Sequence, residues 1–425
     1  MELRRTGVLL AALALTLTGC RGGGDVEAGE IDAPGVTSEP CPDAVNEDNG
    51  CIYLGTISDL TQGPFAPLGV PITEAQKAFW QRVNEDGGIG GYDIDVTEYV
   101  RDNLYNPETH AQVYSEIEPE VLALAQSLGS PTTLAILEQM KNQDVIAAPA
   151  SWTSLWGFED NILESGSSYC VEAMNAVDFL VDRDGVQSVM AVGFPGDFGG
   201  DGAAGAQIAA EENGIDFTNV ETAPGQEAQA GAVSQIVRQD PDVVILGVGP
   251  TETGVIVGQA AAQGFQGQFV GLSPTWNPAL LGSPAAGALE QLYIHVGPWG
   301  SFGSDTPGHE AMREALGKVD QPNDGYTSGW AWSYPLKAAL EEWLDGDYEK
   351  TRAGLLDAVN SLESVDYEGM LPEEAGDRTG ENDIFTQSVI SEVDPDAPAG
   401  LTVLEDFAAG PTASGHTFDG PCFEG

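Results

Sequence analysis

Basic residues are scarce in this sequence: 15 lysines and arginines stand against 67 aspartates and glutamates, which gives a formal net charge of −52. A chain this acidic repels nucleic-acid phosphates and anionic lipid headgroups, so partners of both kinds are excluded. The acidic residues are scattered rather than clustered. We therefore interpret them as a property of the whole surface, suited to high salt, and not as a cation-binding site.

Motifs of common enzymes are also missing. The chain has no G-x-S-x-G, no H-E-x-x-H and no Walker A pattern, which are the short signatures of hydrolases, zinc proteases and nucleotide-binding proteins. The glycines at Gly247 and Gly249 do not complete a dinucleotide-binding motif, because Glu252 stands where the third glycine is needed. We predict a protein that is not an enzyme and has no cofactor.

Metal-ligand spacings are absent as well, because no C-x-x-C pair occurs and the four histidines are far apart in the chain, so no metal site is expected. With Cys20 set aside, an even set of cysteines is left, which three pairings could join into two disulfides. We favour Cys41 with Cys51, which flank a turn-rich loop, and that choice leaves Cys170 for Cys422. The alternative is that Cys170 is a buried thiol on the apolar face of a helix.

The N-terminus has the features of an export signal. Arg4 and Arg5 precede an apolar run, 8–17, that is too short to span a bilayer. The tetrad LTGC that ends at Cys20 resembles the lipobox of bacterial lipoproteins, in which the cysteine thiol receives a lipid. We expect residues 1–19 to be a lipoprotein signal peptide, with an ordinary cleaved signal as the alternative. The protein would then be exported and lipid-anchored to the outer face of the cytoplasmic membrane.

The rest of the chain is long enough for two domains. Residues 20–50 are rich in Gly, Pro, Asp and Glu without apolar periodicity, which is typical of a flexible tether. From residue 51 onward, β-rich runs alternate with helical stretches, as in parallel sheets with helices on both faces. The expected strands are 52–58, 94–99, 121–128, 145–148, 188–193, 217–222, 243–247 and 269–272. The expected helices are 72–85, 107–117, 131–141, 171–183, 202–213, 231–239, 252–263, 310–318, 327–344 and 351–362.

Three segments carry a family resemblance. Residues 57–69 (ISDLTQGPFAPLG), 84–91 (NEDGGIGG) and 102–107 (DNLYNP) together resemble type I periplasmic solute-binding proteins of the leucine/isoleucine/valine-binding kind. The resemblance implies an α/β fold of two Rossmann-like lobes with parallel sheets, joined by three crossover segments. It also implies a small ligand held between the lobes and delivery to an ABC permease in the cytoplasmic membrane. We expect lobe 1 to comprise 51–165 with 297–372, and lobe 2 to comprise 166–296 with 373–425.

The best site candidate follows the strand 121–128. Ser130 precedes Pro131 and can cap the helix that follows, and Thr132 lies in the same turn. Free N–H groups at a helix N-terminus suit a carboxylate or another acceptor-rich group without any basic side chain. The alternative is that Ser130 only caps its helix.

Further candidates lie at other strand ends, where open α/β sheets bind their ligands. By resemblance, Ser151 and Trp152 lie in the cleft and Phe198 covers the ligand, although Trp152 could equally be a core aromatic. The remaining candidates are Phe65 in the first motif and Thr251 and Trp276 at two later strand ends.

The expected ligand is a small polar solute, such as a branched-chain amino acid, an amide or urea. Amino-acid binders of this family have a carboxylate near the turn at 275–276, which this turn lacks, so a neutral amide, a polyol or an aromatic acid fits as well as leucine. The alternatives to transport are a ligand-sensing receptor component of the same fold and an exported enzyme.

Overall fold

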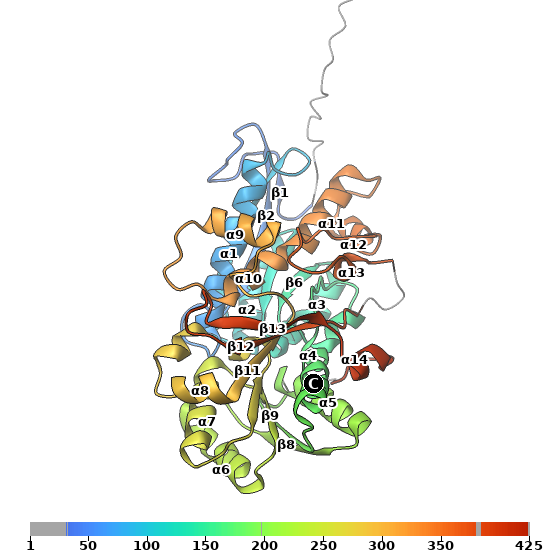
Figure 1. Ribbon diagram of the computed structural model, residues 1–425. Helices are drawn as coiled ribbons and strands as arrows, with labels where there is room; N and C mark the ends of the chain where they lie inside the picture. The colour runs from blue at the N-terminus through green and yellow to red at the C-terminus, as the bar shows by residue number, and fades with distance from the viewer. Residues whose placement is uncertain (1–30, 32, 197, 380–383, 424–425) are drawn as a thin grey trace, which may run out of the picture.

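The computed structural model describes residues 31, 33–196, 198–379 and 384–423, which form two sheets flanked by helices (Figure 1). In this part of the chain, the first sheet has the order β1-β2-β5-β6, with β3 and β4 also paired to β2. All its pairs are parallel except β1 with β2. The strands are β1 (Val36–Thr37), β2 (Gly50–Ser58), β3 (Tyr92–Asp95), β4 (Val100–Asp102), β5 (Ala123–Leu128) and β6 (Ala147–Ala150). We call this sheet and its helices lobe 1.

The helices of lobe 1 come from two separate parts of the chain. They are α1 (Ala66–Glu85), α2 (Pro107–Ile117), α3 (Ser130–Asn142), α9 (Pro307–Leu316), α10 (Asp324–Ala331), α11 (Ser333–Asp345), α12 (Arg352–Val359) and α13 (Glu373–Gly376), with the 3-10 helices η1 (Glu118–Glu120) and η2 (Ser154–Phe158).

The second sheet has the order β13-β12-β11-β10-β9-β7-β8, and we call it lobe 2 together with its helices. Its pairs are parallel except those made by the last two strands, which return antiparallel. The strands are β7 (Ser188–Gly193), β8 (Asp216–Glu221), β9 (Val243–Gly247), β10 (Gln268–Gly271), β11 (Tyr293–Gly297), β12 (Ser388–Val393) and β13 (Leu401–Ala408). The helices are α4 (Tyr169–Asp184), α5 (Phe198–Asn213), α6 (Ala230–Gln239), α7 (Pro250–Ala262), α8 (Ala286–Leu292) and α14 (Pro411–Gly415), with η3 (Gln226–Gln229), η4 (Ser273–Thr275) and η5 (Pro278–Gly282).

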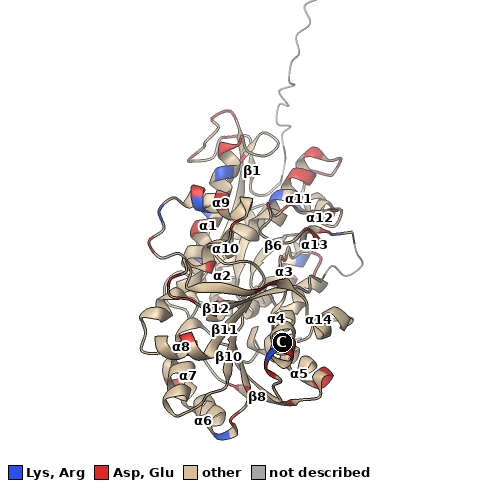
Figure 2. Cartoon of the chain, viewed as in Figure 1, with Lys and Arg blue, Asp and Glu red and all other residues tan. Residues whose placement is uncertain are grey.

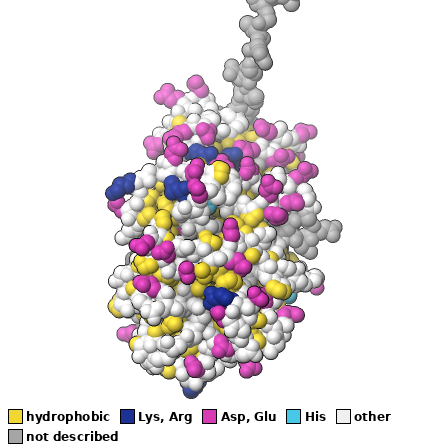
Figure 3. All heavy atoms as spheres, viewed as in Figure 1, with side chains coloured by type: hydrophobic (Ala, Val, Ile, Leu, Met, Phe, Trp, Pro, Cys, Tyr) yellow, Lys and Arg dark blue, Asp and Glu magenta, His cyan; other side chains and the backbone are white. Residues whose placement is uncertain are grey.

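The chain passes between the lobes three times, after β6, after β11 and after α13. Lobe 1 occupies the upper half of Figure 1 and lobe 2 the lower half, with β12 and β13 running across the middle. Acidic side chains are spread over both lobes rather than gathered in one place (Figures 2 and 3). The two-lobed α/β fold expected from the sequence is thus confirmed.

The prediction of a flexible tether is wrong for residues 33–50, because these residues fold onto lobe 1. Val36 and Thr37 pair with β2, and Cys41 forms a disulfide with Cys51. The buried carboxylate of Asp93 accepts hydrogen bonds from the backbone N–H groups of Val45 and Asn46, both at 2.9 Å. These contacts satisfy polar groups that a mobile segment would leave to water. The earlier part of the tether and the signal peptide lie outside the described residues.

Two expected elements are split. The helix expected at 327–344 is two helices, α10 and α11, because Pro335 lacks the N–H that would bond to the carbonyl of Ala331. The strand expected at 94–99 ends at Asp95, whose side chain accepts from the N–H groups of Thr97 and Glu98 and so closes a turn. The strands β4, β11, β12 and β13 were not among those expected from the sequence.

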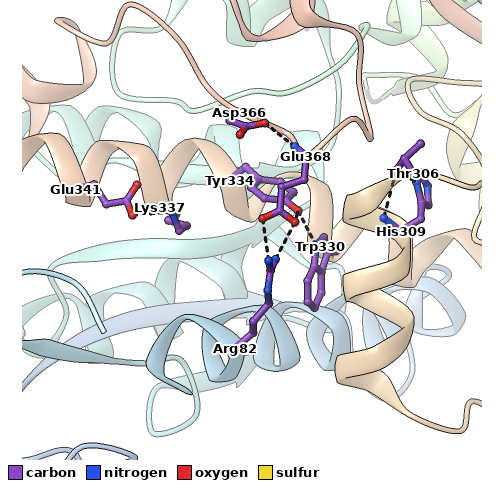
Figure 4. A network of polar contacts seen from close by, with 9 residues as sticks. All are labelled: Arg82, Thr306, His309, Trp330, Tyr334, Lys337, Glu341, Asp366 and Glu368. Carbon is purple, nitrogen blue, oxygen red and sulfur yellow. Dashed lines mark hydrogen bonds and ion pairs between the residues drawn. The ribbon is translucent and has the colours of Figure 1, made fainter. Parts of the chain in front are cut away.

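A network of polar side chains joins the late helices of lobe 1 to α1 (Figure 4). The guanidinium of Arg82 forms two hydrogen bonds of 2.9 Å with the carboxylate of Glu368. Tyr334 donates to the same carboxylate at 3.0 Å and accepts from the indole N–H of Trp330 at 3.0 Å. Paired, charge-assisted bonds of this kind fix geometry as well as adding energy. The network therefore holds the chain returning from α12 against α1, on the side of lobe 1 that carries the later crossings.

Candidate functional site

A cavity lies between the two lobes. The space between its lining atoms is about 840 Å³, and this volume includes the opening to solvent. The centre of a water molecule can reach only about 60 Å³ of that space. The cavity is therefore narrow, with room for a few water molecules or a slender organic molecule. Seven aromatic side chains from both lobes line it, together with several serines and small apolar residues; the aromatic ones are Phe65, Tyr105, Trp152, Tyr169, Phe198, Trp276 and Trp299.

Ser130 lines the cavity at the first turn of α3. The N-cap of this helix is Gly129, with φ at +98°, and no side chain caps it. Ser130 is 3% exposed, and its Oγ has no hydrogen-bond partner within the described chain. A buried hydroxyl without a partner costs free energy, and because Ser130 does not cap its helix, its hydroxyl is available to a molecule in the cavity.

Gly129 is required by the close approach of its neighbours. A Cβ added there would lie 2.6 Å from the ring of Tyr105 and 2.6 Å from Oγ1 of Thr132. Thr132 is buried but does not line the cavity, because its hydroxyl donates to the carbonyls of Leu128 and Gly129. Of the two side chains expected in this turn, only Ser130 therefore reaches the cavity.

Trp152 lines the cavity at the start of the first crossing. Its indole N–H donates to the carbonyl of Ser165 at 3.1 Å, and its ring packs against Trp299 and Tyr169 at centroid distances of 4.9 and 6.1 Å. Ser151 also lines the cavity, and its Oγ accepts from the indole of Trp156 at 3.1 Å. Ser151 and Trp152, the two residues expected in the cleft after β6, therefore both line the cavity.

The lobes touch across the cavity. The rings of Phe65 in lobe 1 and Phe198 in lobe 2 are 5.8 Å apart, and Asn277 in lobe 2 donates to the carbonyl of Pro67 at 3.2 Å. Trp276 lines the cavity as expected, but Thr251 is exposed at the start of α7 and does not line it. The structure is therefore of the closed form, in which both lobes can contact a ligand at once.

Sequence reasoning did not identify several lining residues: Tyr105, Tyr169, His295, Trp299 and Asp324. Tyr105 belongs to the third family-like segment, and that position within the motif was the missed signal; the structure gives it a left-handed backbone, with φ at +52°. His295 and Trp299 lie on and just after β11, a strand that was not expected from the sequence, and Tyr169 and Asp324 are the first residues of helices that do not follow a strand.

The cavity has no fixed positive charge, because none of the described lining residues is Lys or Arg. Burial lowers the pKa of His295 to about 3, so its ring is neutral at physiological pH. Burial raises the pKa of Asp324 to about 7, although the carboxyl accepts a 2.8 Å hydrogen bond from the N–H of Phe302. Asp324 is the only Asp or Glu among these lining residues.

Buried carboxyl groups also connect the first crossing to lobe 2. Asp201 on α5 accepts from the N–H groups of Ser154 and Cys170, both at 3.0 Å, and burial raises its pKa to about 6. Glu172 on α4 accepts from the N–H and hydroxyl of Ser273, which lines the cavity. Burial raises its pKa well above the usual range. These bonds fix the crossing and one cavity wall to the same helices.

Within the described ranges, no group of three or more His, Cys, Asp or Glu residues could hold a metal ion. No helix there has the length and apolar character needed to cross a membrane. The described chain has the two expected disulfides, Cys41–Cys51 and Cys170–Cys422, with S–S distances of 1.99 and 2.03 Å.

Comparisons with solved structures agree with this geometry. A fatty acid ABC transporter substrate-binding protein from Thermomonospora curvata is 26% identical, with a TM-score of 0.82 over 90% of this chain and 96% of that chain. A substrate-binding protein of an ABC transporter from Aeropyrum pernix is 18% identical, with a TM-score of 0.73 over 86% and 98%. A branched-chain amino acid ABC transporter protein from Thermus thermophilus, solved with bound valine, is 16% identical, with a TM-score of 0.72 over 86% and 98%.

None of the curated proteins matches the sequence. The periplasmic binding protein family, in contrast, matches residues 52–396. That range runs from β2 to β12 and includes nearly all of the residues that line the cavity. From this match and the two-lobed fold, the chain belongs to the periplasmic binding protein family.

Proposed function

We propose that this protein is the extracytoplasmic substrate-binding component of an ABC importer, and that it closes around an organic acid with an apolar body. The observation that carries the proposal is the unpartnered hydroxyl of Ser130 in a cavity that seven aromatic side chains line. The acid would be captured between the lobes and handed to a permease in the cytoplasmic membrane. A ligand-sensing receptor component of the same fold would capture its ligand in the same way, and this is the alternative function.

The acid group fits the first turn of α3. This helix has 13 residues, so its N-terminus carries a partial positive charge and N–H groups without helical partners. Ser130 adds a hydroxyl donor at the same place. Together these groups can hold a carboxylate without Lys or Arg, as helix N-termini do for other anions.

The rest of the ligand fits the aromatic walls. Trp152, Trp299 and Phe198 offer apolar faces that a urea or a small polyol would leave without contacts. The Thermomonospora curvata relative is described as a fatty acid transporter protein, which supports an acid of this kind over the small polar solute expected from the sequence.

A ligand panel tests the proposal. Octanoate, decanoate and phenylacetate are compared with valine, leucine, urea and octanamide by thermal shift and calorimetry in molar salt. A ligand present at 100 times its dissociation constant should add about 2.7 kcal/mol to the free energy of unfolding. We expect the apolar acids to give the largest shifts. Shifts produced only by the amino acids or urea would contradict the ligand class, and consumption of a compound would indicate an enzyme.

Replacing Ser130 tests where the acid group lies. Ser130→Ala should weaken octanoate binding by about 1–3 kcal/mol, which is the cost of losing one hydrogen bond to a charged group. Stability should change little, because the hydroxyl has no partner within the described chain. Calorimetry measures the affinity, with Thr251→Ala as the control, since Thr251 is exposed and away from the cavity. Equal affinities for wild type and Ser130→Ala would place the acid group elsewhere.

We also propose that Cys20, which lies outside the described residues, carries the lipid that holds the protein at the membrane. Cys20→Ala should release the protein from the membrane fraction, because one lipid-modified residue is the only anchor proposed. Its affinity for octanoate should equal that of the wild type. Cell fractionation and immunoblotting measure the distribution, and retention of Cys20→Ala at the membrane would contradict the lipid anchor.

A further inference from the structure

Asp324 brings a carboxyl group into a cavity that we assign to an acid. It is the first residue of α10 and lines the cavity, and the N–H of Phe302 on the second crossing donates to one of its oxygens at 2.8 Å. The other carboxylate oxygen accepts no hydrogen bond from the described residues. An ionised Asp324 and a ligand carboxylate would place two negative charges in one narrow space.

Nothing charged compensates Asp324. Its pKa is set by burial and by the Phe302 N–H, and no charged side chain contributes. His295, which lines the same cavity from β11, is neutral because burial lowers its pKa to about 3. Several charged or titratable groups lie on the elements packed against α10. They are Glu74, Lys77, Arg82 and Glu85 on α1, His309, Glu310, Arg313 and Glu314 on α9, Tyr334, Lys337, Glu341, Glu342 and Asp345 on α11, and Asp305 on the second crossing.

Several of these groups are already engaged. Arg313 donates to the carbonyls of Phe302 and Ser304, each at 2.8 Å, and so faces the outer side of the second crossing. Glu74 accepts from the hydroxyl of Tyr326 at 3.0 Å. Arg82 is paired with Glu368. None of them is free to neutralise Asp324 when an anion enters.

We propose that Asp324 is the specificity-determining group of the cavity, and that it must be protonated for an organic acid to bind. Each anion bound is then accompanied by one proton, which stays on the Asp324 carboxyl. The neutral carboxyl can donate to the ligand, whereas the ionised one repels it. This inference rests on the proposed function, because it assumes that the ligand is an acid.

The size of the effect follows from proton linkage. Asp324 has a raised pKa of about 7, so the protonated form predominates below pH 7 and is lost as the pH rises above it. If the bound form keeps its proton, the dissociation constant should rise about tenfold per pH unit above the pKa, or up to about a hundredfold between pH 6 and pH 9. An amino acid would show the opposite trend, because its ammonium group would pair with the ionised carboxyl.

The test is calorimetric titration of octanoate from pH 6 to pH 9 at constant molar salt. Octanoate is ionised throughout this range. Wild type should lose affinity with rising pH and should take up close to one proton per ligand at pH 8, measured in buffers of different ionisation enthalpy. Asp324→Asn keeps an acceptor for the Phe302 N–H but cannot ionise. It should remove the pH dependence and bind octanoate at least tenfold more tightly than wild type at pH 9.

Octanamide, which has no charge, should bind the wild type with an affinity that does not depend on pH. Asp201 and Glu164 also titrate near this range, because burial raises their pKa values to about 6 and about 7. If Asp324→Asn keeps the wild-type slope, one of these groups controls binding and the inference is overturned. A flat wild-type profile, or one that rises with pH, overturns it as well. No octanoate binding at any pH would overturn the proposed ligand class, and this inference with it.

Discussion

Phe198→Ala is expected to weaken octanoate binding by about 30- to 150-fold, with most of the change in the rate of release. Phe198 is 2% exposed, and its ring contacts Phe65 across the cavity and Tyr169 within lobe 2. The contact with Phe65 joins the two lobes, so it stabilises the closed form and not the open one. Losing it together with the ring's apolar contact to the ligand should cost about 2–3 kcal/mol of binding free energy.

Stopped-flow release and calorimetry measure this effect, and Phe265→Ala is the matched control. Phe265 is also buried in lobe 2, where it packs against Phe269 at a centroid distance of 5.0 Å, and it does not line the cavity. Both variants should lose stability, but only Phe198→Ala should lose affinity. An equal loss of affinity in the two variants would show that the effect comes from weakening lobe 2 as a whole.

Local sequence signals predicted much of the fold. The helix α2 begins at Pro107 and ends at Ile117, as expected, because Asn106 caps it by accepting from the N–H of Thr109 at 2.8 Å and proline suits the first helical position. Ser130 and Trp152 were found by one rule, since neighbouring parallel strands bring their carboxyl ends to the same edge. Such signals depend on neighbours in the sequence or on the regular order of a sheet.

Residues placed by the crossings could not be found in this way. Trp299 packs on Trp152 because the chain returns to lobe 1 after β11. Asp324 reaches the cavity because the second crossing bonds to it through Phe302. No periodic sequence pattern predicts either contact, because each depends on how two segments that are distant in the sequence pack together.

Two of the residues expected at the site do not line the cavity, and the reason is different. Thr132 and Thr251 both lie in the first turn of a helix that follows a strand, so the strand-end rule selects both. That rule does not say which side of the turn faces the cavity. The hydroxyl of Thr132 is used by backbone carbonyls, and Thr251 is exposed. The direction of a side chain within one helical turn decides the site, and that direction follows from packing.

Removing the Cys170–Cys422 disulfide should destabilise the protein more than removing the Cys41–Cys51 disulfide. The two cysteines are 252 residues apart in sequence, whereas Cys41 and Cys51 are 10 apart. In the chain-entropy model, a disulfide stabilises by restricting the unfolded chain, by about 5 kcal/mol for the longer loop and about 3 kcal/mol for the shorter one. The double substitution of Cys170 and Cys422 by alanine should therefore lower the free energy of unfolding more than the same change at Cys41 and Cys51.

Backbone hydrogen bonds show which parts of the chain this disulfide joins. The N–H of Cys422 donates to the hydroxyl of Ser154 at 2.8 Å, and the N–H of Cys170 donates to Asp201, so the disulfide joins the C-terminal segment to the first crossing. Urea denaturation in molar salt, without reductant, measures both double variants under conditions that screen the repulsion between acidic side chains. Affinity for octanoate should change less than tenfold in either variant, because none of the four cysteines lines the cavity. If the shorter loop costs as much stability as the longer one, native-state packing around the cysteines outweighs loop entropy, and the expected order is wrong.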